Sequence, residues 1–121
     1  MKQNFSPLPS GVGPPALTAF TPSGELDLPG NRALFEWYAS AGVDGLFVSC
    51  LTGELNCLSI DEILQLNRLA VETAAGRFPV VGGVMPAAPT PETIAADVLR
   101  LAETGVAASV VLVSQLAAPE E

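Results

Sequence analysis

The stretch "GLFVSCLTGEL", residues 45–55, joins a strand signal to a loop that carries polar groups. Its first part is short, nearly all apolar and rich in strand-forming residues, as expected for a strand that is covered on both faces. Ser59 and Glu62 follow with the spacing of a capping box, which predicts that a helix begins there. The triplet at 52–54 is therefore predicted to lie between a buried strand and a helix, where a hydroxyl and free backbone amides can meet a ligand.

The same alternation of strand and helix recurs along the chain. Further strands are predicted at 15–20, 78–84 and 107–113. Between the strands, three helices are predicted to bury one face each, formed by Leu34, Trp37, Tyr38 and Ala41, by Ile63, Leu66, Ala70 and Thr73, and by Ile94, Val98, Leu101 and Ala102. Alternation at roughly thirty residues per repeat is typical of βαβ crossovers on a parallel sheet. Two α/β architectures fit this order, a doubly wound open sheet and a (β/α)₈ barrel, and both gather binding groups in the loops after the strands.

Composition excludes several classes of partner. The 121 residues carry a formal net charge of -8 at pH 7, which opposes nucleic acid phosphates and anionic membrane surfaces. The chain has no stretch of about 18 apolar residues, so we expect a cytoplasmic protein that binds neither nucleic acid nor membrane. Cys50 and Cys57 are seven residues apart and the chain has no histidine, so we expect no metal, no other cofactor and two buried, reduced thiols.

Several motifs in register resemble one enzyme family. In order, they are "ALT-x-F" in the first predicted strand, "GELD", "AGVDGL", "TGE", "LS-x-DE" and "PVVGGV". Together they resemble the N-terminal part of the dihydrodipicolinate synthase and N-acetylneuraminate lyase family. The resemblance implies a (β/α)₈ TIM barrel with parallel strands that condenses or cleaves a 2-oxo acid, usually pyruvate, through a Schiff base on a lysine. Residues 14–121 would then form about four β/α units, the N-terminal half of the barrel, after a leader at 1–13.

The resemblance implies roles for four residues around the loop. Thr52 and Gly53 match the part of the family motif that holds the carboxylate of the oxo acid, and charge-assisted hydrogen bonds suit such an anion. Thr18 and Glu54 are expected to support the loop. Leu51 stands where the family has a threonine that relays protons, and leucine cannot do this. Cys50 also departs from the motif, because it occupies a position where the family usually has glycine.

The catalytic groups of the family are missing from these residues. The only lysine is Lys2, and an imine-forming lysine needs a dry pocket that lowers its pKa. After the fourth predicted strand, Ser114, Gln115 and Leu116 stand where the family has tyrosines. Tyr38 and Trp37 are predicted to be core aromatics of the first helix. The sequence thus predicts no catalytic residue in this chain, and no activity for the chain alone.

Half a barrel has two open sheet edges and an inner face of apolar side chains that no other element covers. Three outcomes fit: a fragment of a longer enzyme, two copies that close one cavity, or an open α/β sheet. The predicted partners are a small 2-oxo acid such as pyruvate and further copies of the chain, through the open edges or as a family-type homo-oligomer. The alternative function is a non-catalytic α/β module that binds a small carboxylate or a protein.

Overall fold

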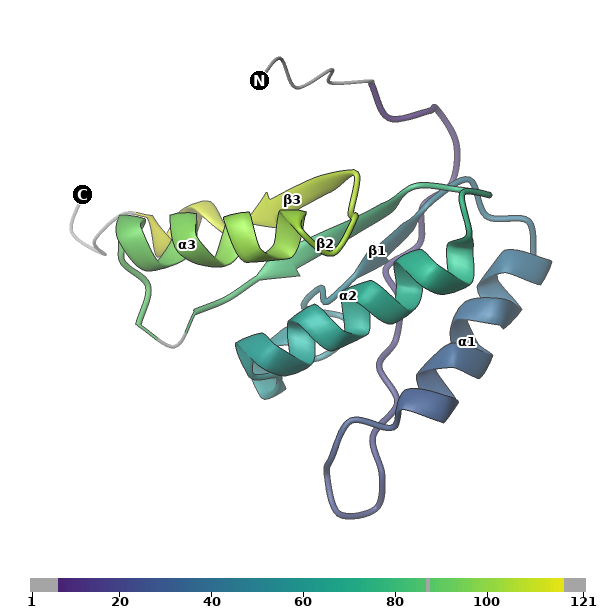
Figure 1. Cartoon of the computed structure of the whole chain (residues 1–121), viewed down its shortest axis with the longest axis horizontal. Helices are drawn as coiled ribbons and strands as arrows, with labels where there is room; N and C mark the ends of the chain where they lie inside the picture. The colour runs from purple at the N-terminus through teal and green to yellow at the C-terminus, as the bar shows by residue number, and fades with distance from the viewer. Residues whose placement is uncertain (1–6, 87, 117–121) are drawn as a thin grey trace.

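The computed structural model describes residues 7–86 and 88–116, so Lys2 and the whole tail after Leu116 lie outside the described residues. Three parallel strands form one sheet in the order β1-β2-β3. Helices alternate with them along the chain (Figure 1). The elements are α1 (Leu28–Ser40), β1 (Leu46–Val48), the short 3₁₀ helix η1 (Leu55–Cys57), α2 (Ile60–Ala74), β2 (Val80–Val84), α3 (Pro91–Ala102), β3 (Ala108–Val111) and the 3₁₀ helix η2 (Val113–Gln115).

The strand predicted at 15–20 is wrong as a regular strand. The segment runs parallel to β1 but makes only an isolated bridge there, between Pro15 and Phe47. Two backbone hydrogen bonds hold it: Ala16 N–H donates to Phe47 O at 2.8 Å, and Phe47 N–H donates to Pro14 O at 3.0 Å. Pro14 and Pro15 have no N–H to donate, so a longer ladder cannot start at this end. The other three predicted strands are confirmed, within a few residues at their ends.

The helices begin where their capping signals place them. The capping box of α2 is confirmed, since Glu62 N–H donates to Ser59 Oγ at 3.2 Å and Ser59 N–H donates to the Glu62 carboxylate at 3.0 Å. In α3, Thr90 is the N-cap as predicted, and Thr93 completes a second reciprocal pair. Side-chain oxygens that accept from first-turn amides satisfy donors that have no partner inside the helix.

The buried face of α1 differs from the predicted one. Asn31, Phe35 and Tyr38 are buried, whereas Trp37 is 62% exposed. Ala41 is also exposed and Leu34 is only half-buried. The Asn31 side chain sets this rotation, because its amide oxygen accepts from Ala19 N–H at 2.8 Å and its amide nitrogen donates to Ala19 O at 3.0 Å. Tyr38 is confirmed as a core aromatic, and its hydroxyl accepts from Leu17 N–H at 3.2 Å.

The predicted faces of the other two helices are largely confirmed. In α2, all four predicted residues are buried: Ile63, Leu66, Ala70 and Thr73. In α3, Ile94 and Leu101 are buried and Val98 is half-buried, but Ala102 is exposed. Ala102 belongs to the last turn, which α3 leaves through Gly105 in the left-handed region at φ +96°.

The two faces of the sheet are unequal. Leu46, Val48, Val80 and Val84 point to the helices and are at most 3% exposed. A side chain at Gly82 would meet Asn67 of α2 and Leu101 of α3, which locates these two helices on that face. Phe47 and Val81 point to the other face and are only half-buried, as is all of β3. We call this second face the open face, because α2 and α3 pack on the opposite one and, of the described helices, only η1 reaches it, where Leu55 lies beside Gly83.

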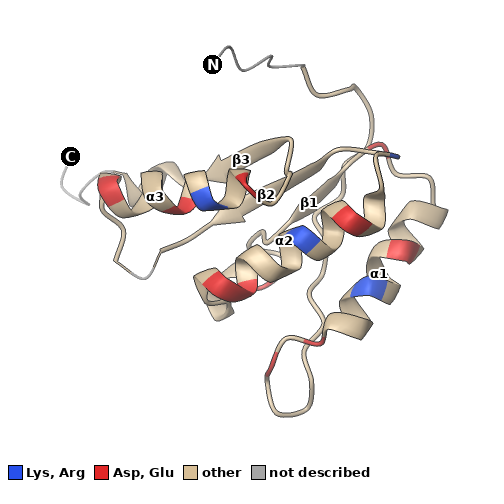
Figure 2. Cartoon of the chain, viewed as in Figure 1, with Lys and Arg blue, Asp and Glu red and all other residues tan. Residues whose placement is uncertain are grey.

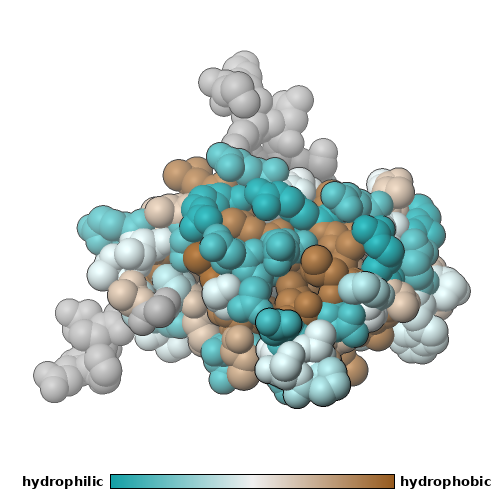
Figure 3. Space-filling view, turned by 60° about the horizontal axis from the view of Figure 1, so that its bottom comes forward, coloured by the Kyte–Doolittle hydropathy of each residue, from teal (hydrophilic) through white to brown (hydrophobic). Residues whose placement is uncertain are grey.

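Charged side chains lie away from the strands. Figure 2 shows the acidic and basic residues on the helices and their connecting loops, with the three strands uncharged. Figure 3 shows apolar surface exposed between polar side chains on one side of the molecule. Large apolar side chains with at least 49% exposure include Leu17, Leu51, Val113 and Leu116.

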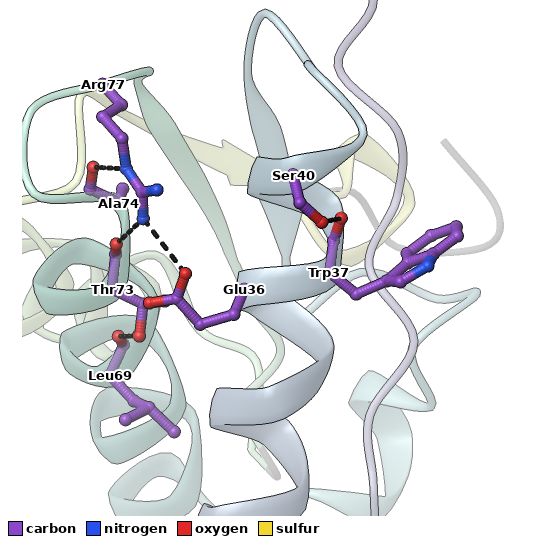
Figure 4. Close-up of polar contacts among 7 residues, drawn as sticks. All are labelled: Glu36, Trp37, Ser40, Leu69, Thr73, Ala74 and Arg77. Atoms are coloured by element: carbon purple, nitrogen blue, oxygen red, sulfur yellow. Dashed lines mark hydrogen bonds and ion pairs between the residues drawn. The ribbon is translucent and has the colours of Figure 1, made fainter.

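Arg77 fastens the end of α2 to α1 (Figure 4). Its guanidinium donates to the carbonyl oxygens of Thr73 and Ala74 in the last turn of α2 and lies 3.4 Å from the Glu36 carboxylate; the Ala74 oxygen also accepts from Arg77 N–H at 2.9 Å. The α1–α2 pair is thus held by packing, by this clamp and by an exposed ion pair between Arg32 and Glu72 at 3.7 Å.

Candidate functional site

The loop at residues 49–54 lies at the carboxyl end of β1 and leads through η1 into α2. This is the predicted placement of the Thr-Gly-Glu triplet, after a buried strand and before a helix. In a parallel sheet with helices on one face, groups at this end of the strands point toward a common region beyond the strand ends.

The loop is closed by its own backbone. Gly53 N–H donates to Cys50 O at 3.0 Å and lies 3.3 Å from the Cys50 sulfur. Glu54 N–H donates to Leu51 O at 3.0 Å, and Leu55 N–H donates to Cys50 O at 3.1 Å. Because the Gly53 amide already has a partner within the loop, it is not free to bind an anion in this conformation.

The first segment of the chain packs under this loop. The Thr18 hydroxyl donates to Gly53 O at 2.6 Å, and the Cys50 thiol lies 3.7 Å from Ala16 O. A Cβ atom at Gly53 would come within 2.5 Å of Ala16 O, so only glycine fits there. This hydrogen bond is of the kind that a loop-supporting residue makes; the functional role of Thr18 stays a prediction.

Thr52 is exposed and borders a hollow of about 270 Å³. No hydrogen bond from another described residue reaches its hydroxyl or its amide. None of the residues that line the hollow is charged, and most are apolar: Pro15, Phe47, Ser49, Cys50, Leu51, Thr52, Leu55, Gly83, Val84, Val110 and Leu112. The arrangement offers one free hydroxyl at the edge of an apolar cavity on the open face.

Glu54 shapes the loop through its backbone. The residue lies in the left-handed region at φ 61°, and its carbonyl oxygen accepts from Cys57 N–H at 2.8 Å. Its carboxylate is on the exposed side of the loop and has no hydrogen bond within the described residues. The predicted support through that carboxylate therefore stays a prediction.

Ser49 was not singled out by the sequence reasoning. It is fully buried, takes φ 48° and makes three hydrogen bonds through its hydroxyl, with Gly83 N–H, Gly83 O and the Asn67 amide. The sequence signal for this cluster is weak: a serine that interrupts an apolar strand, and two consecutive glycines in the next strand.

Predictions were also made for the two cysteines and for the segment after β3. Cys50 is buried and Cys57 is exposed, so the prediction of two buried thiols is wrong for Cys57; both are free thiols. Ser114 and Gln115 lie in η2, just beyond β3 and at the same end of the sheet as the loop.

Over 7–86 and 88–116, no group of three acidic or sulfur ligands could hold a metal ion. None of the described helices is long and apolar enough to cross a membrane.

Comparison with known proteins identifies the relatives of this chain. The model of the dihydrodipicolinate synthetase family matches residues 8–116. The 4-hydroxy-tetrahydrodipicolinate synthase of Azoarcus sp. (strain BH72) is 43% identical over 67 residues, which are 55% of this chain and 23% of that protein. Among curated relatives of this kind, the chain thus spans about a quarter of their length.

Solved structures agree on the fold. Dihydrodipicolinate synthase from Aquifex aeolicus superposes with a TM-score of 0.73 at 26% identity, over 84% of this chain and 33% of that chain. YagE from Escherichia coli K12, solved in complex with pyruvate, gives a TM-score of 0.72 at 32% identity, over 84% of this chain and 33% of its own. The predicted fold class is confirmed: the sheet and helices are part of a (β/α)₈ barrel, and the chain belongs to the dihydrodipicolinate synthetase family.

Proposed function

We propose that this chain carries the carboxylate-binding part of a lyase or synthase that acts on a 2-oxo acid such as pyruvate. The observation that carries the proposal is the free Thr52 hydroxyl beside an apolar hollow, in a loop of the family motif. One relative, YagE, was solved with pyruvate, whose carboxylate and short apolar remainder suit such a cavity. Gly53 contributes by its shape, since its amide is bonded within the loop and its lack of a side chain allows the loop to close.

The chemical step needs a group that these residues lack. A Schiff base forms when an uncharged amine adds to the ketone carbon and water leaves, so the amine must be held in a site that lowers its pKa. The single lysine of the chain is Lys2. We therefore propose that the 121 residues bind the oxo acid without converting it, and that residues beyond them supply the amine in a complete barrel.

A pyruvate titration followed by NMR tests the binding. The amide signals of residues 52 and 53 should shift in the unmodified chain and stay unmoved in Thr52→Val. Thr21→Val is the matched control, because Thr21 lies in the 21–25 turn, outside the hollow, and should leave the titration unchanged. A titration without any shift in the loop would contradict the proposed binding.

Borohydride reduction in the presence of pyruvate tests the absence of covalent chemistry. We expect no gain in mass, because the chain has no buried lysine within its described residues. A stable gain on the unmodified chain, lost when Lys2 is replaced, would show that the chain forms the imine unaided. This second experiment separates a binding fragment from an active enzyme.

A non-catalytic module that binds a small carboxylate or a protein is the second candidate. The observation that favours it is the leucine at position 51, 56% exposed, in place of a hydroxyl. The two candidates differ in selectivity: a non-catalytic carboxylate-binding module should bind acetate and pyruvate alike, whereas a 2-oxo acid site should prefer pyruvate.

In keeping with the composition, we also propose a cytoplasmic location.

We further propose self-association through the open face. Apolar surface drives association, and the chain exposes such surface at half-buried Phe47 and Val81 and at exposed Leu17. Light scattering over a range of concentrations should show a mass that rises above that of one chain. A stable monomer that binds no apolar dye would contradict this proposal.

A further inference from the structure

Ser49 stands where the sheet ladder stops and the loop begins. The last paired residues of β1 and β2 are Val48 and Gly82. One residue later the backbone turns away from the sheet, with Ser49 at φ 48°, a region that serine seldom adopts. The turn removes the β1 backbone groups that a longer ladder would have brought opposite Gly83.

The Ser49 hydroxyl bonds to the backbone of Gly83 in place of further β1 backbone groups. It donates to Gly83 O at 2.8 Å and accepts from Gly83 N–H at 3.1 Å, so both backbone groups of Gly83 that face β1 are satisfied. Its second lone pair accepts from the Asn67 side chain at 2.9 Å. A hydroxyl has one hydrogen to donate and two lone pairs, so its capacity is fully used.

The backbones of Ser49 and Gly83 are in close contact. A Cβ atom at Gly83 would lie 2.4 Å from Ser49 O, so the two backbones approach as closely as glycine allows. Ser49 has no exposed surface, and it lines the hollow together with Gly83 and Thr52. Thr52 is only three residues further along the chain, with a turn closed by hydrogen bonds between them.

We propose that Ser49 is a positioning residue that aims Thr52 at the hollow. Its hydroxyl fixes the start of the loop to β2 and α2, while Thr18 holds the other end through Gly53 O. That the ligand is pyruvate rests on the proposed function. The effect of Ser49 on the order of the loop does not depend on it. All three hydrogen-bonding positions of the Ser49 hydroxyl are occupied, so it has none left to offer a ligand.

Hydrogen exchange in Ser49→Ala tests the positioning role. The amides of Gly53, Glu54 and Leu55, which are bonded within the loop, should exchange about tenfold faster, as expected for the loss of hydrogen bonds that hold the loop closed. Thr104→Ala is the matched control. Thr104 is also buried and its hydroxyl donates to Leu101 O at 2.6 Å, but it lies at the end of α3 and does not line the hollow. This control should lower stability without a selective effect on the loop.

Pyruvate titration of the same variants gives the functional readout. Ser49→Ala should bind about tenfold more weakly than the unmodified chain, and Thr104→Ala equally well. If Ser49→Ala does not fold, Ser49→Gly replaces it, because glycine tolerates the left-handed backbone while removing the hydroxyl. Loop exchange equal to that of the unmodified chain would overturn the inference. An unmodified chain that fails to bind pyruvate defeats the proposed function instead, and the exchange experiment then still decides the role of Ser49.

Discussion

The two faces of the sheet differ in how deeply their side chains are buried. On the helix face, side chains such as Val48 and Leu101 have no exposed surface and pack between strands and helices. On the open face, Phe47, Val81 and Val110 are half-buried, and the hollow beside Thr52 lies at the end of the strands. The difference indicates that the helix face supplies most of the stability, whereas the open face supplies the candidate site and depends on neighbours for its cover.

The largest effect should come from truncating the helix face. Leu101→Ala removes a fully buried side chain and leaves a cavity, so the free energy of unfolding should fall by about 2–5 kcal/mol. Val110→Ala on the open face should cost about 1 kcal/mol or less, because the side chain is already partly in contact with water. Urea unfolding of both variants measures the difference, and equal losses would refute the inequality of the two faces.

A somewhat smaller effect should follow from Gly83→Ala, at the boundary between the faces. The added methyl group would meet the backbone oxygen of Ser49 at 2.4 Å, and β1 would have to move. Overpacking of this kind typically costs about 1–3 kcal/mol. Gly13→Ala is the control, because its nearest contact is 3.7 Å and its backbone is not in the left-handed region. Similar unfolding free energies for the two variants would show that the backbone at Ser49 moves aside for the added methyl group at little cost.

The helix face was the more predictable of the two. Apolar periodicity placed Ile63, Leu66 and Ala70 correctly, because burial against a sheet selects for residues at helical spacing. In α1 the same reasoning chose Trp37 instead of Asn31, since asparagine does not count as apolar even where it is buried and hydrogen-bonded.

The open face and its loop were predicted in position but not in detail. A strand signal before residue 50 and a capping box after residue 58 bracket the loop, so its location followed from local rules. The role of Ser49 depends on Gly83, 34 residues away, and on a left-handed backbone that serine does not favour. The sequence carries only a weak sign of such a contact, a serine that interrupts an apolar strand and two consecutive glycines in the next. The segment at 15–20 is the opposite case, because Pro14 and Pro15, which cannot donate to a ladder, are a local sequence feature that disfavours a regular strand there.

A change of about 1 kcal/mol is expected from Thr18→Val, which removes the hydroxyl that supports the loop from the first segment. Gly53 O would lose its 2.6 Å partner while the volume of the side chain is kept. Thermal unfolding should show a small shift, and hydrogen exchange should rise for Gly53 more than for residues of α2. A uniform rise in both would show that Thr18 supports the domain as a whole and has no special tie to the loop.

The smallest effect concerns the outer layer of the helix face. Arg77→Met keeps the length of the side chain but removes the clamp on the Thr73 and Ala74 carbonyls and on Glu36. We expect a loss of about 0.5–1 kcal/mol, because these groups are half-exposed and water competes for them. Arg32→Met is the matched control, since among the described residues Arg32 pairs with Glu72 alone, at 3.7 Å and with both side chains more than half exposed. Its loss should be close to zero.

Salt separates the two parts of the Arg77 effect. The part that persists at high salt reports the bonds to the helix carbonyls, since screening weakens the ion pair with Glu36 first. Urea unfolding at low and high salt therefore separates packing of α1 on α2 from their polar clamp, and an Arg77→Met loss that vanishes in salt would assign the whole effect to the ion pair.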